Sequence, residues 1–373
     1  MSVYERLGVR PVINARGMNT KAGGSIMPAP VLQAMTEAAS AFVDMGELNR
    51  RAGAHLARLL SVPDAHVTSG SAGGMLLAAA AVLAGEDPER IARLPDTTGM
   101  RNELVIQACT RIWYDQALRT AGARLVAVGS AARCTESEVE AAIGPRTAAL
   151  VYIVSPRLGE EGVPADRMAV LAHARGLPLI VDAASTLPPV GHLRRWLDEG
   201  ADLVIYSGGK GIRGPQDTGL LLGRSDLVRA AAANGAPNAA IGRPCKVSKE
   251  AIVGLVAAVE LFLGTDHDAE WARHLAEARL IAAALDGLPG VGSHIEDDRS
   301  VWTAPTLLVA LDPEATGRTP EELEAILQRG EPSIMTRPFQ GRLLVDCHCL
   351  RDGEAAIVAR RLGEALVRVP AAR

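Results

Sequence analysis

The stretch ADLVIYSGGKGIRGPQDTGLLL, residues 201–222, decides how the rest of the chain is interpreted. A short apolar segment leads into a glycine-rich turn with one lysine, a second turn follows at Gly214 and Pro215, and a second apolar segment ends the stretch. This pattern predicts two strands joined by a loop whose backbone can approach a ligand closely. Lys210 stands in that loop, and a lysine amine with a lowered pKa can form a Schiff base with a carbonyl cofactor. Taken alone, such a lysine is more often an exposed loop residue.

Composition and charge set the broad class of the protein. The chain has 373 residues, of which 48% are hydrophobic and 3% aromatic, and this suits a globular enzyme with more than one domain. A formal net charge of −4 without a lysine-rich tract argues against a nucleic-acid partner. Five cysteines form no disulfide pattern and the chain opens without an apolar signal segment, so we expect reduced thiols in a cytoplasm. The apolar run at residues 75–84 is too short to span a bilayer, and we expect no membrane role.

The middle of the chain alternates between apolar strands and helical patterns. Strands are predicted at residues 65–68, 104–106, 124–128, 148–153, 179–182 and 203–206. Most connections are too long for hairpins and suit βαβ crossovers. This predicts a three-layer α/β fold, in which helices cover both faces of a doubly wound, mostly parallel sheet. Ligands collect at the carboxyl ends of such strands, where the sequence places Asp182, Lys210 and residues 69–74.

Three parts are expected along the chain. Residues 1–27 are rich in glycine and polar groups and form an N-terminal arm, of a kind that often crosses a dimer interface. Residues 28–265 form a large ligand-binding domain, which opens with a helix predicted from residue 28 through Phe42 and a second helix at residues 49–60. Residues 266–373 mix helices with short strands and form a smaller C-terminal α+β domain.

The sequence SGSAGG at residues 69–74 joins a predicted strand to the amino-terminal end of a helix rich in alanine and leucine. Backbone N–H groups and the positive end of the helix dipole make such a turn a natural phosphate cradle, to which the Ser69 and Ser71 hydroxyls can add donors. The spacing of its glycines, which include Gly70 and Gly74, matches neither GxGxxG nor GxxxxGK[ST]. A simple tight turn therefore remains an alternative.

The apolar strand LIVD at residues 179–182 ends in a carboxylate that is costly to bury without a partner. A protonated pyridine nitrogen is a suitable partner, because Asp182 would keep the ring cationic and able to accept electrons. An ordinary helix N-cap is the alternative. Asp182 lies 28 residues before Lys210 on the preceding strand, which is the order expected if both residues reach one ring.

Six segments together make the sequence recognisable. They are VINA at 12–15, SGSAGG at 69–74, VD at 181–182, YSGGKGIRGPQ at 206–216, GRPCK at 242–246 and RGEPSIMTR at 329–337. In this order they resemble the pyridoxal-phosphate enzymes of the selenocysteine synthase and D-glucosaminate-6-phosphate ammonia-lyase group, which have the aspartate-aminotransferase fold, fold type I. The lysine-containing block is the most specific of the six, and the RGEP block supports it independently.

The resemblance implies that pyridoxal 5'-phosphate is the cofactor. It implies that Lys210 forms the Schiff base with this cofactor and that Asp182 pairs with the pyridine nitrogen. The residues implied to hold the cofactor through its phosphate are Ser69, Gly70, Ser71, Gly74 and Ser207.

Five basic residues are candidate substrate contacts. Arg337 matches the position that binds a substrate carboxylate, which suits a guanidinium fork, and a surface arginine is the alternative. Arg243 and Lys246 match a loop that in the family meets a second anionic group on the substrate, a contact that could cross a dimer interface; solvated surface charge is a nearly equal alternative. Arg16 in the arm is a further candidate, and Arg111 is the fifth.

Arg111 follows the strand at residues 104–106, in the loop that usually covers the cofactor ring in this fold. The family has a different residue type there, so the sequence does not decide whether Arg111, Trp113 or neither stacks on the ring, although a planar guanidinium could. No metal site is expected. The sequence CHC at residues 347–349 lies in an apparent strand, whose alternation would place the two cysteines on one face and His348 on the other.

The favoured function is an ammonia-lyase that converts a β-hydroxy or sugar-derived amino acid with an anionic tail, such as D-glucosaminate 6-phosphate, to a 2-keto acid and ammonia. In this interpretation Lys210 removes the α-proton, and the cofactor ring, kept cationic by Asp182, takes up the electrons. An amino-acid racemase, an aldolase, a selenocysteinyl-tRNA-type transferase and a non-catalytic cofactor-binding protein are the alternatives.

The transferase is disfavoured because the VINA segment begins at residue 12, which we take to leave no room for an N-terminal tRNA-binding domain, and no basic tract compensates. We expect an anionic small-molecule substrate, no nucleic acid, and a homodimer or higher homo-oligomer, since this fold builds its cofactor site at a dimer interface.

Overall fold

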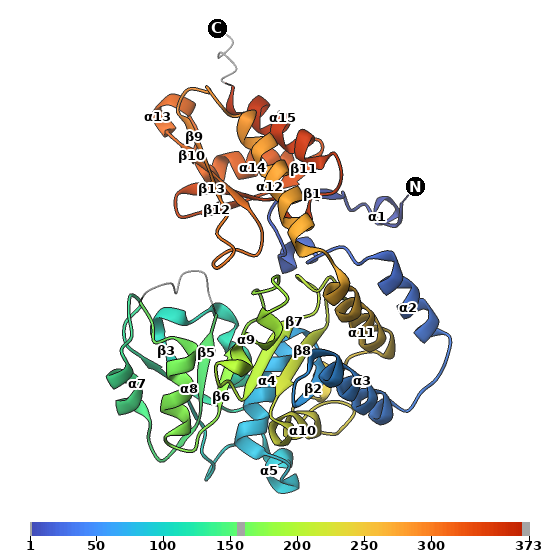
Figure 1. Cartoon of the computed structure of the whole chain (residues 1–373), viewed down its shortest axis with the longest axis vertical. Coiled ribbons are helices and arrows are strands. Elements are labelled where there is room, and N and C mark those ends of the chain that lie inside the picture. The colour runs from blue at the N-terminus through green and yellow to red at the C-terminus, as the bar shows by residue number, and fades with distance from the viewer. Residues whose placement is uncertain (1, 155–160, 368–373) are drawn as a thin grey trace. The chain divides into compact units, whose positions relative to one another are not determined.

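The computed structural model describes residues 2–154 and 161–367, and Figure 1 shows its helices and strands. The chain divides into two compact units. The large unit is Met27–Thr265, and the small unit combines Met1–Ile26 with Asp266–Arg373. None of the helices in the described ranges is both long and apolar enough to cross a membrane.

The large unit is built on a sheet that has seven strands among the described residues, in the order β2-β8-β7-β6-β5-β3-β4. These strands are β2 (Asp64–Thr68), β3 (Glu103–Gln107), β4 (Arg124–Val128), β5 (Thr147–Ile153), β6 (Leu179–Asp182), β7 (Leu203–Ser207) and β8 (Gly219–Gly223). Neighbours from β4 through β7 run parallel, whereas β8 is antiparallel to both β7 and β2. The predicted α/β fold with a mostly parallel sheet is confirmed.

Helices cover both faces of this sheet and complete three layers, as Figure 1 shows. One face packs against α2 (Ala29–Ala39), α3 (Met45–Leu60), α7 (Glu136–Ala142), α8 (Ala165–His173), α9 (His192–Asp198) and α11 (Lys249–Gly264). The other face packs against α4 (Gly70–Ala84), α5 (Pro88–Arg93), α6 (Gln116–Thr120) and α10 (Ser225–Ala233). Within β7, Val204 and Tyr206 join the first core, while Leu203 and Ile205 join the second. A strand that is buried on both faces needs apolar residues at every position, which explains why β7 is apolar from Leu203 through Tyr206.

Helix α4 is apolar on every side because it lies within the second core. Its first turns approach β7 so closely that a Cβ on Gly74 would lie 2.8 Å from Cγ2 of Ile205. Gly74 therefore lets the helix pack against the sheet, and this packing fixes where the amino-terminal end of α4 lies.

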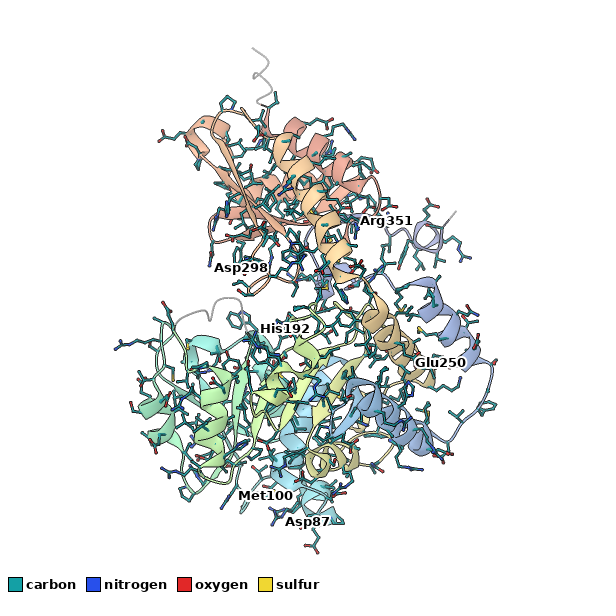
Figure 2. The ribbon with its side chains drawn as sticks, in the orientation of Figure 1. Asp87, Met100, His192, Glu250, Asp298 and Arg351 are labelled. Carbon is teal, nitrogen blue, oxygen red and sulfur yellow. The ribbon has the colours of Figure 1, made fainter. Side chains whose placement is uncertain are left out.

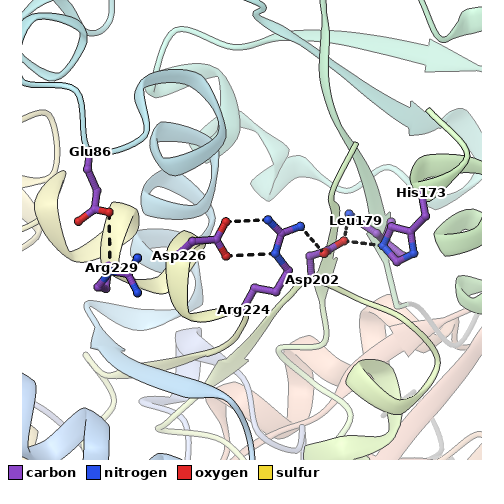
Figure 3. Close-up of polar contacts among 7 residues, drawn as sticks. All are labelled: Glu86, His173, Leu179, Asp202, Arg224, Asp226 and Arg229. Atoms are coloured by element: carbon purple, nitrogen blue, oxygen red, sulfur yellow. Dashed lines mark hydrogen bonds and ion pairs between the residues drawn. The ribbon is translucent and has the colours of Figure 1, made fainter. Parts of the chain in front are cut away.

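A polar network ties the strands together at the amino-terminal end of β7 (Figure 3). The buried carboxylate of Asp202 accepts hydrogen bonds from the backbone N–H of Leu179 at 2.8 Å and from Nη1 of Arg224 at 2.9 Å, and it contacts Nε2 of His173 at 2.9 Å. Arg224 also pairs with Asp226 at 2.6 Å. These donors offset the cost of burying the Asp202 charge, so the network stabilises this end of the sheet.

The small unit contains a four-stranded antiparallel sheet within the described residues, in the order β12-β13-β10-β9. Its strands are β9 (Val291–Glu296), β10 (Thr306–Leu311), β12 (Arg337–Phe339) and β13 (Arg342–Asp346), and its helices are α1 (Val3–Arg6), α12 (His267–Ala283), α13 (Pro313–Thr316), α14 (Pro320–Arg329) and α15 (Glu354–Leu366). Apolar residues of α12, α14 and α15 form one core with Leu343 and Val345 of β13.

The N-terminal segment is a structural part of the small unit. Strand β1 (Val12–Asn14) pairs in parallel with β11 (Ser333–Met335), and the backbone N–H of Asp346 donates to the carbonyl of Ala15 at 2.9 Å. Ile13 is buried in the core of this unit. That the same segment also crosses a dimer interface stays a prediction.

Two local expectations from the sequence were wrong. The helix predicted through Phe42 ends at Ala39, and Phe42 is fully exposed. The strand predicted across CHC ends at Asp346, and Cys347–Cys349 form a short 3-10 helix, so the alternation argument does not apply there. The cause is the Asp346 side chain, because Oδ1 accepts a hydrogen bond from the backbone N–H of His348 at 2.8 Å and turns the chain. In the described part of the chain, no group of three or more His, Cys, Asp or Glu side chains is arranged to hold a metal ion.

Candidate active site

Asp182 and Lys210 lie at the same edge of the large unit's sheet. Asp182 is the last residue of β6, and its neighbour across the parallel β6–β7 pair is Ile205. Lys210 follows the end of β7 by three residues. Both residues therefore stand at carboxyl ends of adjacent strands, which is where ligands bind in this class of sheet.

Lys210 is half-buried, and its Nζ donates to Oγ of Ser185 at 2.6 Å. Burial lowers the pKa of Lys210, and the negative charge of Asp182 acts in the opposite sense. A lowered pKa makes the neutral amine more available near neutral pH, and only the neutral amine can attack a carbonyl.

Asp182 is 4% exposed, and burial raises its pKa. Its Oδ1 accepts a hydrogen bond from the backbone N–H of Ala184 at 3.0 Å, and this bond and the charge of Lys210 both oppose the shift. No other hydrogen bond to this carboxylate comes from residues 2–154 or 161–367. Because a carboxylate can accept about four hydrogen bonds, Asp182 has capacity left for a cationic N–H donor.

The loop that carries Lys210 folds back on itself between β7 and β8. The backbone N–H of Gly208 donates to the carbonyl of Thr218 at 2.8 Å. A Cβ on Gly209 would collide with Gln216, and one on Gly211 would collide with the carbonyl of Leu187. The glycines beside Lys210 thus permit a compact loop that holds the lysine at the strand end.

The segment after Asp182 is anchored to β7, and it carries Ser185, the partner of Lys210. The buried hydroxyl of Tyr206 donates to the carbonyl of His192 at 2.5 Å, and Nδ1 of His192 is 2.8 Å from the carbonyl of Thr186. Figure 2 labels His192 at the start of α9. Burial lowers the pKa of His192, and a neutral ring can donate its Nδ1–H to that carbonyl.

Helix α4 begins at Gly70, and Ser69 is its N-cap residue. The Ser69 side chain makes no capping hydrogen bond, so its hydroxyl and the first N–H groups of the helix can serve a ligand. Ser71 lies in the first turn, and Ser207 is buried at the end of the neighbouring β7. Gly74 is instead buried under Ile205, so its structural role is packing.

The residues present fit pyridoxal phosphate. Lys210 provides an amine for the aldehyde, Asp182 provides acceptor capacity for a pyridinium N–H, and the amino-terminal end of α4 provides donors for a phosphate. These three features lie in one unit at the carboxyl ends of its strands, which is the arrangement that the sequence predicted.

Arg111 is held within its own loop. Its Nε is 2.7 Å from Oδ2 of the buried Asp115, and this hydrogen bond raises the pKa of Arg111. Trp113 is 96% exposed. Whether either side chain stacks on the cofactor ring stays a prediction.

Arg243 and Lys246 line one pocket of about 400 Å³ in the large unit, together with His66, Asn49 and Asp217. Arg243 begins the 3-10 helix η5 (Arg243–Cys245), and both cations are exposed. The structure therefore brings these two predicted residues together in a pocket that can hold an anion.

Sequence reasoning missed His66, which lies in the wall of the same pocket. It is 6% exposed, makes no hydrogen bond within the described residues, and has a pKa lowered by burial to about 4. Its ring is thus neutral near neutral pH and presents one donor and one acceptor. No signal in the sequence singles it out, because it stands inside a predicted strand.

The remaining predicted residues belong to the small unit. Nη1 of Arg16 is 2.9 Å from Oε1 of Glu324 and donates to the carbonyl of Thr336 at 3.1 Å, so Arg16 is engaged within its own unit. The guanidinium of Arg337 lies 5.4 Å from the ring centre of Phe339, and its charge lowers the pKa of Asp346 against the larger effect of burial, which raises it. Contact of Arg16 or Arg337 with a substrate stays a prediction.

The fold and the site define a pyridoxal-phosphate enzyme of fold type I. The sequence model of the L-seryl-tRNA selenium transferase family matches residues 12–297, and the chain belongs to this family. The resemblance seen in the sequence is thereby confirmed.

Two similar proteins and one similar structure refine this placement. The chain is 39% identical to a 5'-C-glycyluridine monooxygenase-decarboxylase from a Streptomyces species, over 98% of this chain and 92% of that protein. It is 34% identical to the D-glucosaminate-6-phosphate ammonia lyase of Salmonella typhimurium, over 97% of both chains. A solved structure of D-glucosaminate-6-phosphate ammonia-lyase, also 34% identical, superposes with a TM-score of 0.84 over 98% of both chains.

Proposed function

We propose that this protein is a pyridoxal-phosphate-dependent ammonia-lyase that converts an anionic, sugar-derived or β-hydroxy amino acid, such as D-glucosaminate 6-phosphate, to a 2-keto acid and ammonia. The observation that carries the proposal is the pair of Lys210 and Asp182 at adjacent strand ends, in a chain similar along its whole length to such a lyase.

Each residue of the site has a defined task in this reaction. Pyridoxal phosphate, when bound, supplies a cationic ring that takes up the electrons released at the α-carbon of the substrate. Nζ of Lys210 accepts the α-proton, and Oγ of Ser185 orients that amine before the substrate enters. The Asp182 carboxylate would accept the N–H of the ring and keep its charge, while the amino-terminal end of α4 would bind the phosphate. The β-hydroxyl leaves as water, taking up the proton that Nζ of Lys210 has accepted, and one water molecule then adds to the eliminated product to give the 2-keto acid and ammonia.

The pocket of Arg243 and Lys246 supports a substrate with an anionic tail. Two exposed cations in one concave pocket attract a phosphate, and the neutral ring of His66 can bond to a hydroxyl beside it. Arg337 is proposed to bind the substrate carboxylate, which its guanidinium fork suits.

The direct test incubates the protein, loaded with pyridoxal phosphate, with D-glucosaminate 6-phosphate and measures 2-keto acid and ammonia. We expect both products in equal amounts, and neither from the Lys210→Ala variant. If no ammonia is released from this compound or from a panel of related β-hydroxy amino acids, the lyase proposal is wrong. Racemisation and aldol cleavage release no ammonia, so the same assay separates them from elimination.

The 39% identity to a monooxygenase-decarboxylase supports a second candidate, an oxygen-dependent decarboxylation of a nucleoside-linked amino acid. The cofactor site would serve this reaction equally, because both reactions begin by releasing electrons at the α-carbon. The test supplies 5'-C-glycyluridine and follows consumption of O₂ and release of CO₂. Turnover here without ammonia release from D-glucosaminate 6-phosphate would replace the first candidate by the second.

We also propose a cytoplasmic homo-oligomer, with residues 28–265 as the cofactor-binding domain and residues 266–373 as the small domain. The large unit has exposed apolar side chains, among them Leu32, Phe42 and Val43, that a second copy of the chain would cover in an oligomer. Light scattering of the purified protein tests this, and a monomer at micromolar concentration would contradict it.

A further inference from the structure

Asp346 lies beside Arg337 in the sheet of the small unit. In the antiparallel β12–β13 pair, Arg337 stands opposite Leu344. Asp346 is two residues further along β13, so it faces the same side as Arg337, away from the core that contains Leu343 and Val345. Such diagonal neighbours are about 7–8 Å apart at their backbones, within reach of a long side chain. Burial raises the pKa of Asp346 and the charge of Arg337 acts in the opposite sense, so the two groups lie near enough to interact electrostatically, although no ion pair joins these two described residues directly.

The Asp346 carboxylate is held from several directions. Its backbone N–H donates to the carbonyl of Ala15, and its Oδ1 accepts from the backbone N–H of His348. Gly17 packs directly on the other oxygen, since a Cβ at that position would collide with Oδ2. The N-terminal segment and the 3-10 helix after β13 thus fix where this negative charge lies.

The other arginine near Asp346 does not compete for the carboxylate. Arg16 forms a backbone bridge with Asp346, but its Nη1 is engaged by Glu324 and by the carbonyl of Thr336. Of these two arginines, Arg337 is therefore the one whose guanidinium can turn toward the Asp346 carboxylate. A guanidinium has five N–H donors, which is enough to bond one carboxylate of the protein and to present a fork to a second carboxylate.

We infer that Asp346 is a positioning residue that orients the Arg337 guanidinium for the carboxylate of the substrate, and that Gly17 exists as glycine to let Asp346 take this position. The inference rests on the proposed function, in which Arg337 binds the substrate carboxylate. It predicts an effect on substrate binding with little effect on the chemical step.

The experiment compares Asp346→Asn, Arg337→Ala and the double variant, each loaded with pyridoxal phosphate. We expect KM to rise about 10-fold in Asp346→Asn with kcat changed by less than about twofold, and to rise further in Arg337→Ala. Because Asp346 acts through Arg337, adding Asp346→Asn to Arg337→Ala should raise KM no further. Additive increases would overturn the inference, as would an unchanged KM in Asp346→Asn.

A second pair of variants guards against a simple loss of folding. Gly17→Ala and Gly23→Ala replace glycines with nearly equal positive φ, 81° and 84°, but only Gly17 contacts Asp346, while Gly23 faces open space. Both variants carry the strain of a positive φ, but we expect Gly17→Ala to lose more thermal stability because its Cβ collides with Asp346, and only Gly17→Ala to raise KM. Equal KM in both would contradict a role for the Gly17 contact.

A binding measurement separates this inference from the proposed function. Calorimetric titration of Lys210→Ala with D-glucosaminate 6-phosphate reports affinity without turnover. If Arg337→Ala weakens binding and Asp346→Asn does not, the positioning role fails while the proposed function stands. If the wild-type chain releases no ammonia, the proposed function fails first, and weaker binding of the same compound on Asp346→Asn still supports the positioning role.

Discussion

Two buried aspartates lie at opposite ends of two neighbouring strands in the same sheet. Asp202 precedes β7 at its amino-terminal end and has three partners, the N–H of Leu179, Arg224 and His173 (Figure 3). Asp182 ends β6 at the carboxyl end and accepts one hydrogen bond from the described residues. Both side chains are about 5% exposed or less. The described part of the protein therefore supplies several hydrogen-bond partners to the buried Asp202 carboxylate and only one to the buried Asp182 carboxylate.

This difference in hydrogen bonding distinguishes a residue that stabilises the fold from one that can bind a ligand. A buried charge that has its full set of donors holds the strands together, and removing it leaves those donors unpaired. A buried charge with spare acceptor capacity is unfavourable in the protein alone and becomes favourable when a cationic ligand arrives. On this basis we propose that Asp202 is a structural residue and that Asp182 binds the cofactor.

The largest effect is expected at Asp182. Asp182→Asn should lower kcat/KM by about 1000-fold or more, roughly 4 kcal/mol, because the ring loses the negative charge that keeps it cationic. The same change should leave the midpoint of thermal unfolding of the cofactor-free protein unchanged or higher, since it removes a poorly paired buried carboxylate. Kinetics and calorimetry on one preparation check both parts, and a clear loss of stability would break the contrast with Asp202.

Asp202→Asn should show the reverse pattern. Losing the charge weakens its bonds to Arg224 and His173, and we expect the free energy of unfolding to fall by about 3 kcal/mol. The kcat of the folded enzyme should stay within about twofold of the wild type, because Asp202 lies at the end of the sheet away from Lys210. Urea unfolding measures the first quantity; an unaltered midpoint would mean that the network contributes little.

A smaller effect is expected in the pocket of Arg243 and Lys246. Lys246→Gln should raise KM for a phosphorylated substrate by about 10-fold, roughly 1.4 kcal/mol, with kcat unchanged. The matched control is Lys21→Gln, a change of the same type at a lysine outside the pocket, which should leave KM unaltered. Equal effects in the two variants would show that overall charge, and not the pocket, is responsible.

The smallest effect is a pH dependence of stability. Burial raises the pKa of Asp182 above its ordinary value of 3.8, so in a window above pH 3.8 the folded state keeps a proton that the unfolded state has lost. The contribution of Asp182 to stability therefore falls as pH rises through this window. In the cofactor-free protein, the stability of the wild type relative to Asp182→Asn should decline as pH is raised from 3.8. Urea unfolding at several pH values checks the slope, and a rising difference would contradict the stated pKa direction.

The sequence alone placed the main strands, because each is a short apolar run ended by a turn residue. It also placed Lys210 and Asp182 at strand ends, since both follow such runs directly. These inferences depend on local pattern, and local pattern is strong where a strand is buried on both faces.

Other features depend on contacts between distant parts of the chain and left no local signal. The parallel pairing of β1 with β11 joins residues more than 300 positions apart. The 3-10 turn after β13 follows from one bond of Asp346, and His66 becomes a pocket residue only through the loop that carries Arg243. The ion pair between Arg16 and Glu324 could not be predicted from the sequence either, because Glu324 lies on a helix about 300 positions further along the chain.

The most direct test of the account is a titration of cofactor-free protein with pyridoxal phosphate, followed by visible absorbance, for the wild type, Asp182→Asn and Asp202→Asn. We predict that Asp182→Asn binds the cofactor at least about 10-fold more weakly, because it loses a charge-assisted hydrogen bond to the ring, whereas Asp202→Asn binds it as the wild type does. Equal affinity in Asp182→Asn and the wild type would contradict the claim that the incompletely bonded aspartate marks the cofactor site.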